Sequence, residues 1–401
     1  MRLKFKYLLT AATSTFIIMI TFIFLTLSQK DYSTRSVKVG FVFIGDSSTA
    51  YTNNFCRSQN ELMDAFPDNV TTVAKYNIPE DNCEPAIRDL IENGCDIIFG
   101  TSYGYGEMMK LMAAENPKIQ FCQATCSDAN QEPVFSNYHN FMGTIYEGRY
   151  VSGIVAGMKL RELIEEKKLT PDKAKIGYVA AFPFAEVISG YTAFLLGIRS
   201  VVPEAVMTVH YTNTWSNTVT ERKVAERLIE EGCVIISQHS DTTGPAVACE
   251  VASTKYGKTI YHVGYNQSMT DVAPTTSLVS TRINWTPYII SAVEAVMKNR
   301  KIESVVKGSV FGNDVAAGFE NGWCEMVGLN KLIAAEGTKE KIETTVRQFK
   351  NKNFVVFKGN YTGVNPFDPN DTYDLKKPFI ENANQSAPSF NYILKDVVTV
   401  E

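Results

Sequence analysis

The feature that most constrains the fold is a regular alternation of strand-like and helix-like segments between residues 175 and 241. Apolar strand patterns cover 175–181, 205–211 and 233–237, and amphipathic helix-length runs separate them. This alternation predicts a parallel sheet with helical crossovers. Ligands gather at the carboxyl ends of such strands. The loops there carry rings and polar groups suited to a small-molecule pocket: Phe182, Trp215, His239 and Asp241.

A similar run of strands and helices covers residues 37–122, so the chain is expected to hold two α/β lobes. Its 401 residues are enough for two domains with sizeable cores. Gly100, Gly104 and Gly106 lack the spacing of a dinucleotide-binding turn. The predicted fold is a clamshell of two doubly wound parallel-sheet lobes. The expected division is a linker at 30–36, lobe 1 at 37–143 with a return segment at about 284–300, lobe 2 at 144–283, and a C-terminal crossover and surface extension at 301–401.

The N-terminal segment, residues 1–29, is expected to be a membrane anchor or a signal peptide. Arg2, Lys4 and Lys6 precede an uncharged run at 7–29, and a bilayer span needs roughly 20 apolar residues. The preceding cations keep the N-terminus in the cytosol and send the rest of the chain across. An uncleaved anchor is favoured because the only cleavage-like site, at 26–28, is weak. The remainder is therefore expected on the extracytoplasmic face of the membrane.

Composition excludes several classes of protein. The net charge of −4 gives no basic surface for nucleic acid. The four histidines and eight cysteines include no His-x-x-x-His or Cys-x-x-Cys pair, so no metal site is expected. The cysteines are interpreted as mostly buried free thiols, with disulfides as the alternative. No nucleophile with a neighbouring base is recognised, so neither catalytic residues nor a cofactor is predicted.

Individual loop residues each have a binding and a structural interpretation. Trp215 lies among polar neighbours and is interpreted as a ring that stacks on the ligand, worth on the order of 1–3 kcal/mol. Asp241 could accept two N–H donors or cap the next helix. Phe182 could face the ligand or close the core of the sheet. In the first loop, 45–51, small hydroxyl residues could contact a ligand or cap a helix.

Several motifs, in order along the chain, resemble the basic membrane protein (BMP) family of ABC-transporter substrate-binding proteins. They are Gly100-Thr-Ser-Tyr-Gly-Tyr, Ile145-Tyr-Glu-Gly-Arg-Tyr-Val-Ser-Gly, Ile176-Gly-Tyr-Val-Ala-Ala-Phe-Pro, Thr212-Asn-Thr-Trp and Gln238-His-Ser-Asp. The resemblance runs from about residue 38 to 358. It implies a type I periplasmic-binding-protein fold, a purine nucleoside or nucleobase bound between the lobes, a permease partner and a monomer.

Carried over by position, the resemblance implies a set of ligand-binding residues: Asp46, Ser48, Thr49, Ser102, Tyr103, Phe182, Trp215, Asp241, Asn266 and Trp285. Two departures from the family pattern bear on the ligand. Thr49 stands where relatives typically have a tryptophan, and Asn266 where they typically have aspartate. Sugar binding, or a ligand-sensing ectodomain of the same fold, are the alternative functions.

Overall fold

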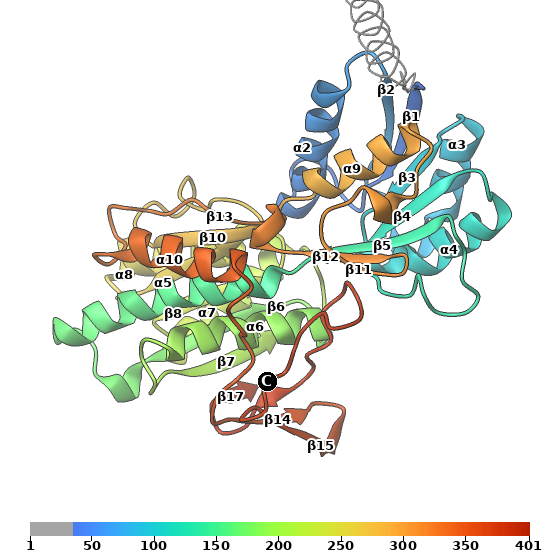
Figure 1. Ribbon diagram of the computed structural model, residues 1–401. Helices are drawn as coiled ribbons and strands as arrows, with labels where there is room; N and C mark the ends of the chain where they lie inside the picture. The colour runs from blue at the N-terminus through green and yellow to red at the C-terminus, as the bar shows by residue number, and fades with distance from the viewer. Residues whose placement is uncertain (1–34) are drawn as a thin grey trace, which may run out of the picture.

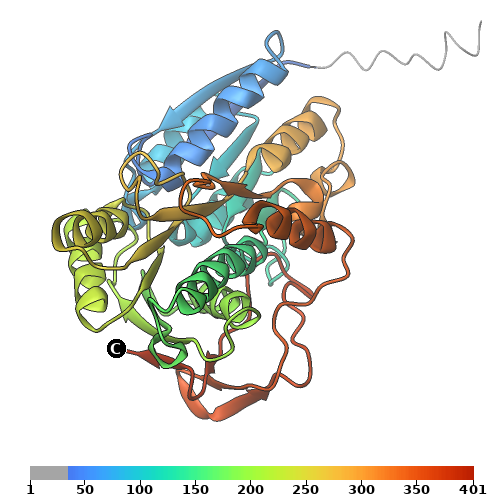
Figure 2. The same cartoon turned by 90° about the vertical axis from the view of Figure 1, so that its left-hand side faces the viewer.

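The computed structural model describes residues 35–401, which form two seven-stranded sheets flanked by helices, and a smaller three-stranded sheet (Figure 1). The expected anchor at 1–29 lies outside the described residues. We call the part built on the first seven-stranded sheet lobe 1 and the part built on the second lobe 2. Turned by 90°, the view shows the blue helices and strands of lobe 1 above the green ones of lobe 2 (Figure 2).

Lobe 1 is a parallel sheet with one antiparallel edge strand, in the order β11-β12-β5-β4-β3-β1-β2. Its strands are β1 (Val37–Val42), β2 (Val70–Lys75), β3 (Ile97–Gly100), β4 (Gln120–Ala124), β5 (Tyr138–Gly143), β11 (Ser309–Phe311) and β12 (Asp314–Ala317). Helices α2 (Ala50–Ala65) and α9 (Thr286–Met297) pack together on one face, and α3 (Glu84–Glu92) and α4 (Gly106–Glu115) cover the other. Near-continuous apolar strands such as β1 and β3 fit a sheet buried on both faces.

Lobe 2 has the same design, with strand order β13-β10-β9-β8-β6-β7-β17. Its strands are β6 (Lys175–Ala180), β7 (Val206–Tyr211), β8 (Ile235–His239), β9 (Tyr261–Tyr265), β10 (Ser277–Ile283), β13 (Cys324–Val327) and β17 (Val398–Val400). Helices α5 (Ile145–Glu165), α6 (Ala185–Arg199) and α10 (Thr338–Lys350) lie on one side, and α7 (Thr218–Glu230) pairs with α8 (Gly244–Tyr256). Helices α5 and α6 touch through Gly153 and Gly197, where a Cβ atom would collide with backbone of the other helix.

The chain passes between the lobes at residues 143–145, 283–286 and 317–324. The Thr144 amide donates to the Ala317 carbonyl (2.8 Å), which joins the first and third crossings. The buried carboxylate of Glu147 accepts from Thr144 Oγ1 and from the Phe319 amide, both at 3.0 Å. Burial raises the pKa of Glu147 to about 7. These crossings form the hinge region of the clamshell.

The C-terminal third divides between the two lobes before it reaches a tail. Strands β11 and β12 belong to lobe 1, and β13 and α10 belong to lobe 2. The tail begins after α10, at about residue 351. It forms the three-stranded sheet of β14 (Thr362–Asn365), β15 (Asp368–Asp374) and β16 (Ile393–Leu394) before β17 joins lobe 2. Within the tail, Phe357 and Phe379 form an isolated bridge.

Two further expectations concern membrane crossing and cysteines. Within residues 35–401, none of the helices combines the length and apolarity required to traverse a bilayer. All eight cysteines are unpaired, and all but the half-buried Cys56 are buried. The interpretation as mostly buried free thiols is therefore confirmed.

Candidate functional site

A cavity lies between the lobes, at the carboxyl ends of strands from both sheets. Side chains of both lobes line it. Lobe 1 contributes Ile44, Tyr51, Ser102, Tyr103 and Thr125. Lobe 2 contributes Glu186, Trp215, His239, Asp241 and Tyr265. We call this space the inner cavity.

Trp215 is a wall of the inner cavity, as the sequence indicated. Its ring is half-buried and meets the Phe182 ring edge-on, with centroids 5.1 Å apart. Phe184 stacks on Phe182 at 5.2 Å and also contacts Trp215. Phe182 itself is not among the residues lining the cavity and lies behind Trp215. Its observed role is therefore to hold the indole in place.

Asp241 also faces the inner cavity. Asn266 Nδ2 donates to Asp241 Oδ1 (2.9 Å), and the Asp241 amide donates to the Trp215 carbonyl (2.9 Å). Burial, reinforced by the nearby Glu221 and Glu186, raises the pKa of Asp241 to about 8. The helix-capping alternative is not observed, because the Gly244 amide at the start of α8 donates to Thr242 Oγ1 instead. Asp241 therefore keeps hydrogen-bonding capacity for a ligand.

A single buried carboxylate, Glu221 on α7, organises the loops that carry Trp215 and Asp241. Its Oε1 accepts from the Asn217 amide (2.9 Å), in the loop after β7. Its Oε2 accepts from Ser240 Oγ (2.8 Å) and Thr242 Oγ1 (2.7 Å), in the loop after β8. Glu221 has no exposed surface. The two loops are thus held by one side chain.

Charged groups form the floor of the cavity on the lobe 2 side. The buried Arg149 guanidinium lies 3.7 Å from the Tyr265 ring centroid, and its Nη1 donates to the Gln238 carbonyl (2.7 Å). His239 Nε2 lies 3.4 Å from Glu186 Oε1. Burial, together with the Arg149 charge, lowers the pKa of His239 to about 4, so the imidazole is neutral at physiological pH. The charge of the buried Arg149 therefore acts on both His239 and Asp241.

The first loop differs from its predicted role. Asp46, Ser48 and Thr49 are not among the residues lining the inner cavity. The Asp46 carboxylate closes its own turn by accepting from the Ser48 amide (2.9 Å) and from Asn77 Nδ2 (3.1 Å), and these bonds lower its pKa. The loop still supplies a ring, since Tyr51 on the first turn of α2 lines the cavity. The tryptophan missing at position 49 does not leave lobe 1 without an aromatic wall.

Ser102 and Tyr103 do line the cavity, after β3. Residues 100–104 also have the Gly-x-Ser-x-Gly spacing of a hydrolase nucleophile elbow. Ser102 lacks the strained turn of that motif: its backbone is extended (φ −120°, ψ 146°), and its Oγ donates to Glu80 Oε1 at 2.6 Å. The geometry therefore favours a binding role for this serine.

Asn266 and Trp285 lie outside the cavity wall. Asn266 is buried at φ 64° and acts on the site by donating to Asp241. Trp285 is 1% exposed and stacks on Phe55 of α2 at 4.5 Å, with its edge toward Tyr51 and Phe141. Its prediction as a ligand residue is corrected: Trp285 precedes α9, and the packing of α9 on α2 places the indole in the core of lobe 1.

Several cavity residues were not chosen as ligand-binding from the sequence: Ile44, Tyr51, Thr125, Glu186 and Tyr265, with His239 named only as a strand-end polar group. Ile44, Thr125 and Tyr265 stand at or just after the carboxyl end of a strand, whereas Tyr51 and Glu186 lie in the first turns of α2 and α6. Thr125 has a further signal in the structure, a left-handed backbone (φ 66°) that is unusual for a β-branched residue. Strained backbone of this kind concentrates at functional sites.

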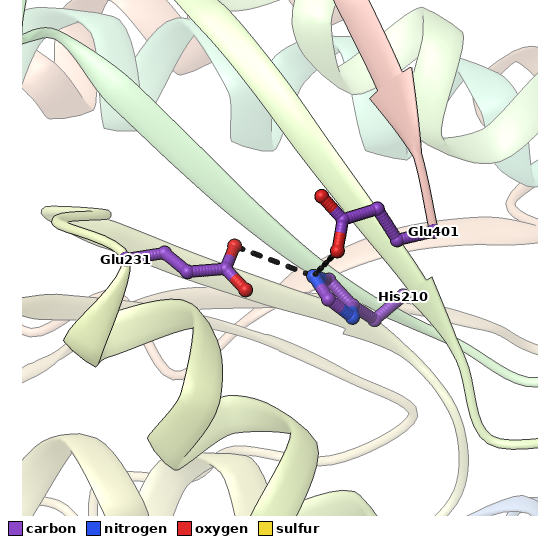
Figure 3. A group of neighbouring side chains, drawn as sticks. All are labelled: His210, Glu231 and Glu401. Carbon is purple, nitrogen blue, oxygen red and sulfur yellow. Dashed lines mark hydrogen bonds and ion pairs between the residues drawn. The ribbon is translucent and has the colours of Figure 1, made fainter.

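Among residues 35–401, one group of side chains could supply three metal ligands: His210, Glu231 and Glu401 (Figure 3). His210 Nε2 lies 3.3 Å from Glu231 and 3.9 Å from Glu401. Both carboxylates are already paired with Arg227, at 3.0 and 2.5 Å. The group is best described as an ion-pair network that fastens the end of β17 beside β7.

Two α/β lobes joined by three crossings, with a cavity between them, define a two-lobed binding protein of the periplasmic type. The model of the Bmp family, described as ABC transporter substrate-binding protein PnrA-like, matches residues 37–358. The chain belongs to this family. The family and the fold are those of extracytoplasmic substrate-binding proteins rather than enzymes, and imply a small-molecule ligand and permease partners.

Relatives and solved structures agree with this assignment. A purine-binding protein of Brucella abortus is 30% identical over 293 residues, covering 70% of this chain and 77% of the relative. A putative ABC transporter glucose-binding protein of Haloferax volcanii is 28% identical over 329 residues, covering 81% and 75%. The structure of a solute-binding protein from Conexibacter woesei superposes with a TM-score of 0.61 at 14% identity, covering 80% of this chain and 98% of that one. The structural likeness concerns the fold alone.

Proposed function

We propose that this protein captures a purine nucleoside or nucleobase in the inner cavity and delivers it to an ABC permease. The observation that carries the proposal is the placement of Trp215 and Asp241 in one cavity closed by both lobes. A flat ring and a carboxyl group suit a heteroaromatic base, whose face can stack and whose edge presents N–H donors and nitrogen acceptors. The relative named as purine-binding supports the same ligand class.

Capture would proceed by clamshell closure. The ligand enters the open form and meets one lobe, and rotation about residues 143–145, 283–286 and 317–324 brings the other lobe over it. The lobes already meet at the cavity, where Asn54 Nδ2 of lobe 1 donates to the Asn266 carbonyl of lobe 2 (3.1 Å). Closure excludes water from the base and strengthens its hydrogen bonds.

Calorimetry on residues 36–401 tests the proposal. Adenosine, inosine, guanosine and adenine are titrated, with glucose, arabinose and ribose as the comparison panel. We expect a purine to bind and to be recovered unchanged by chromatography. A response to sugars without any response to purines would refute the proposal.

Sugar binding is the second candidate, because the similar protein of Haloferax volcanii is named as glucose-binding. Aromatic rings beside carboxylates such as Glu186 could also hold a sugar. The same calorimetric panel separates the two functions.

We also propose that residues 1–29 anchor the protein in the membrane and that the rest of the chain lies on the extracytoplasmic side. The protein is proposed to be a monomer. N-terminal analysis of the protein from its native membrane should find residue 1, and light scattering of residues 36–401 should give the mass of a monomer. A start near residue 29 would show a cleaved signal peptide instead.

A further inference from the structure

A second cavity adjoins the inner one on its outer side. It has an empty volume of about 760 Å³ and shares Tyr103, Thr125, Glu186 and Trp215 with the inner cavity. Both lobes contribute to it, and the rest of its lining comes from the tail: Phe367, Ala387, Pro388 and Asn391. We call this space the outer chamber. The tail lies beyond residue 358, where the family match ends.

The tail is firmly attached to lobe 2. Strand β17 pairs with β7, and Arg199 Nε of α6 donates to the Tyr361 hydroxyl (3.0 Å). Ser189 Oγ of α6 donates to Glu381 Oε2 (3.1 Å). The buried Glu381 also accepts from the Ser389 and Phe390 amides, which fixes the shape of the loop between them.

The same loop reaches lobe 1. The Ser386 amide donates to Asp314 Oδ2 of β12 (2.9 Å), and Ser386 Oγ donates to the Cys126 carbonyl (2.8 Å). Ser386 has no exposed surface. In Figure 1 this part of the red tail rises from the side of lobe 2 toward β12. Residues 381–391, which we call the strap, therefore touch both lobes within a few residues.

We propose that the strap is part of the ligand site: it walls the outer chamber and must leave lobe 1 before a bound ligand can exchange. Rotation of lobe 1 away from lobe 2 moves Asp314 and Cys126, whereas Glu381 stays with α6. Such a rotation would break the Ser386 contacts. This inference rests on the proposed function for the identity of the ligand, but the contacts that carry it do not depend on that identity.

The test uses the double variant Ser386→Ala/Asp314→Ala, which removes both contacts between strap and lobe 1. Ser237→Ala is the matched control, because Ser237 Oγ donates to the Val263 carbonyl (3.0 Å) within lobe 2 alone and is equally buried. Adenosine dissociation is followed by stopped-flow fluorescence. We expect roughly 5- to 150-fold faster dissociation from the double variant, as for two lost hydrogen bonds, and no change in the control.

Hydrogen exchange of the ligand-free protein supplies an independent readout. Amides 386–391 should exchange faster in the double variant than in the wild type, with the control unchanged. Equal exchange, or equal adenosine dissociation, in wild type and double variant would overturn the proposal. If adenosine does not bind at all, the proposed ligand is wrong, and the hydrogen-exchange result alone tests whether the strap is held on lobe 1.

Discussion

The two walls of the inner cavity differ in chemistry although they come from lobes of the same design. The lobe 2 wall carries Glu186, Asp241 and the indole of Trp215, above the buried Arg149. The lobe 1 wall carries no charged side chain; its members are Ile44, Tyr51, Ser102, Tyr103 and Thr125. The difference suggests that lobe 2 recognises the ligand and lobe 1 covers it. A ligand entering the open clamshell would then bind lobe 2 first.

The comparison requires that Trp285 belongs to the core of lobe 1 and not to its cavity wall. Trp285→Ala should cost about 3–5 kcal/mol of unfolding free energy, because a fully buried indole stacked on Phe55 is removed. Urea unfolding measures this loss, with Trp215→Ala as the control that should leave stability nearly unchanged. If Trp285→Ala instead weakens binding in a stably folded protein, the indole belongs to the ligand site.

Recognition by lobe 2 predicts a strong effect of Trp215. Trp215→Ala should weaken purine binding by roughly 1–3 kcal/mol, about 5- to 150-fold, since it removes the stacking surface. Calorimetry measures the affinity, and the melting temperature of the ligand-free protein should hold. An undiminished affinity would show that the base stacks elsewhere, for instance on Tyr51 of lobe 1.

Asp241, in the lobe 2 wall, should make ligand affinity depend on pH. With a pKa of about 8, its carboxyl is mostly protonated at pH 6 and about half ionised at pH 8. Guanosine presents paired N–H donors and would bind the ionised form, so its affinity should rise roughly 10- to 50-fold from pH 6 to pH 8. Adenosine, with a donor beside an acceptor, would bind the protonated form and show no such rise.

His239 and Tyr51 of the cavity wall do not change their protonation between pH 6 and pH 8. His239, with its pKa lowered to about 4, stays neutral across that window, and the raised pKa of Tyr51 keeps its phenol protonated. Asp241→Asn should abolish the dependence on pH. A purine that binds equally well at both pH values in the wild type would mean that its edge does not meet Asp241.

Substitutions in the lobe 1 wall of the inner cavity should reduce ligand affinity least. Tyr51→Phe removes the hydroxyl that donates to the Thr101 carbonyl (2.5 Å) and keeps the ring. The expected loss of affinity is about 0.5–1.5 kcal/mol or less, the net worth of one hydrogen bond. A loss as large as that of Trp215→Ala would show that the two walls share recognition equally.

Much of this fold was predictable because its signal is local. The strands predicted at 175–181, 205–211 and 233–237 agree with β6, β7 and β8, and the motifs between 100 and 241 led to the correct family. Long apolar runs and strand-end loops carry their own structural information.

The features that the sequence did not predict depend on contacts between residues far apart in the chain. Trp285 stands after a strand, as Trp215 does, and only the packing of α9 on α2 makes it a core residue. The short strands β12 and β17 have weak patterns of their own and form by pairing with β5 and β7, which are distant in the sequence. Glu221 looks like a solvated helix residue in the sequence, since nothing local shows that two loops converge on it.

The position of Glu221 has a practical consequence for redesign. The loop that carries Trp215 and the loop that carries Asp241 are both hydrogen-bonded to Glu221, so they form one structural unit. Substitutions in one loop are expected to be non-additive with those in the other. Grafting residues 212–217 from a relative without 238–242 and α7 would leave Glu221 with unmatched partners. Transferring the segment 212–242 as one block keeps Glu221 together with the two loops that it binds. Such a transfer is expected to carry the ligand preference of one family member to another.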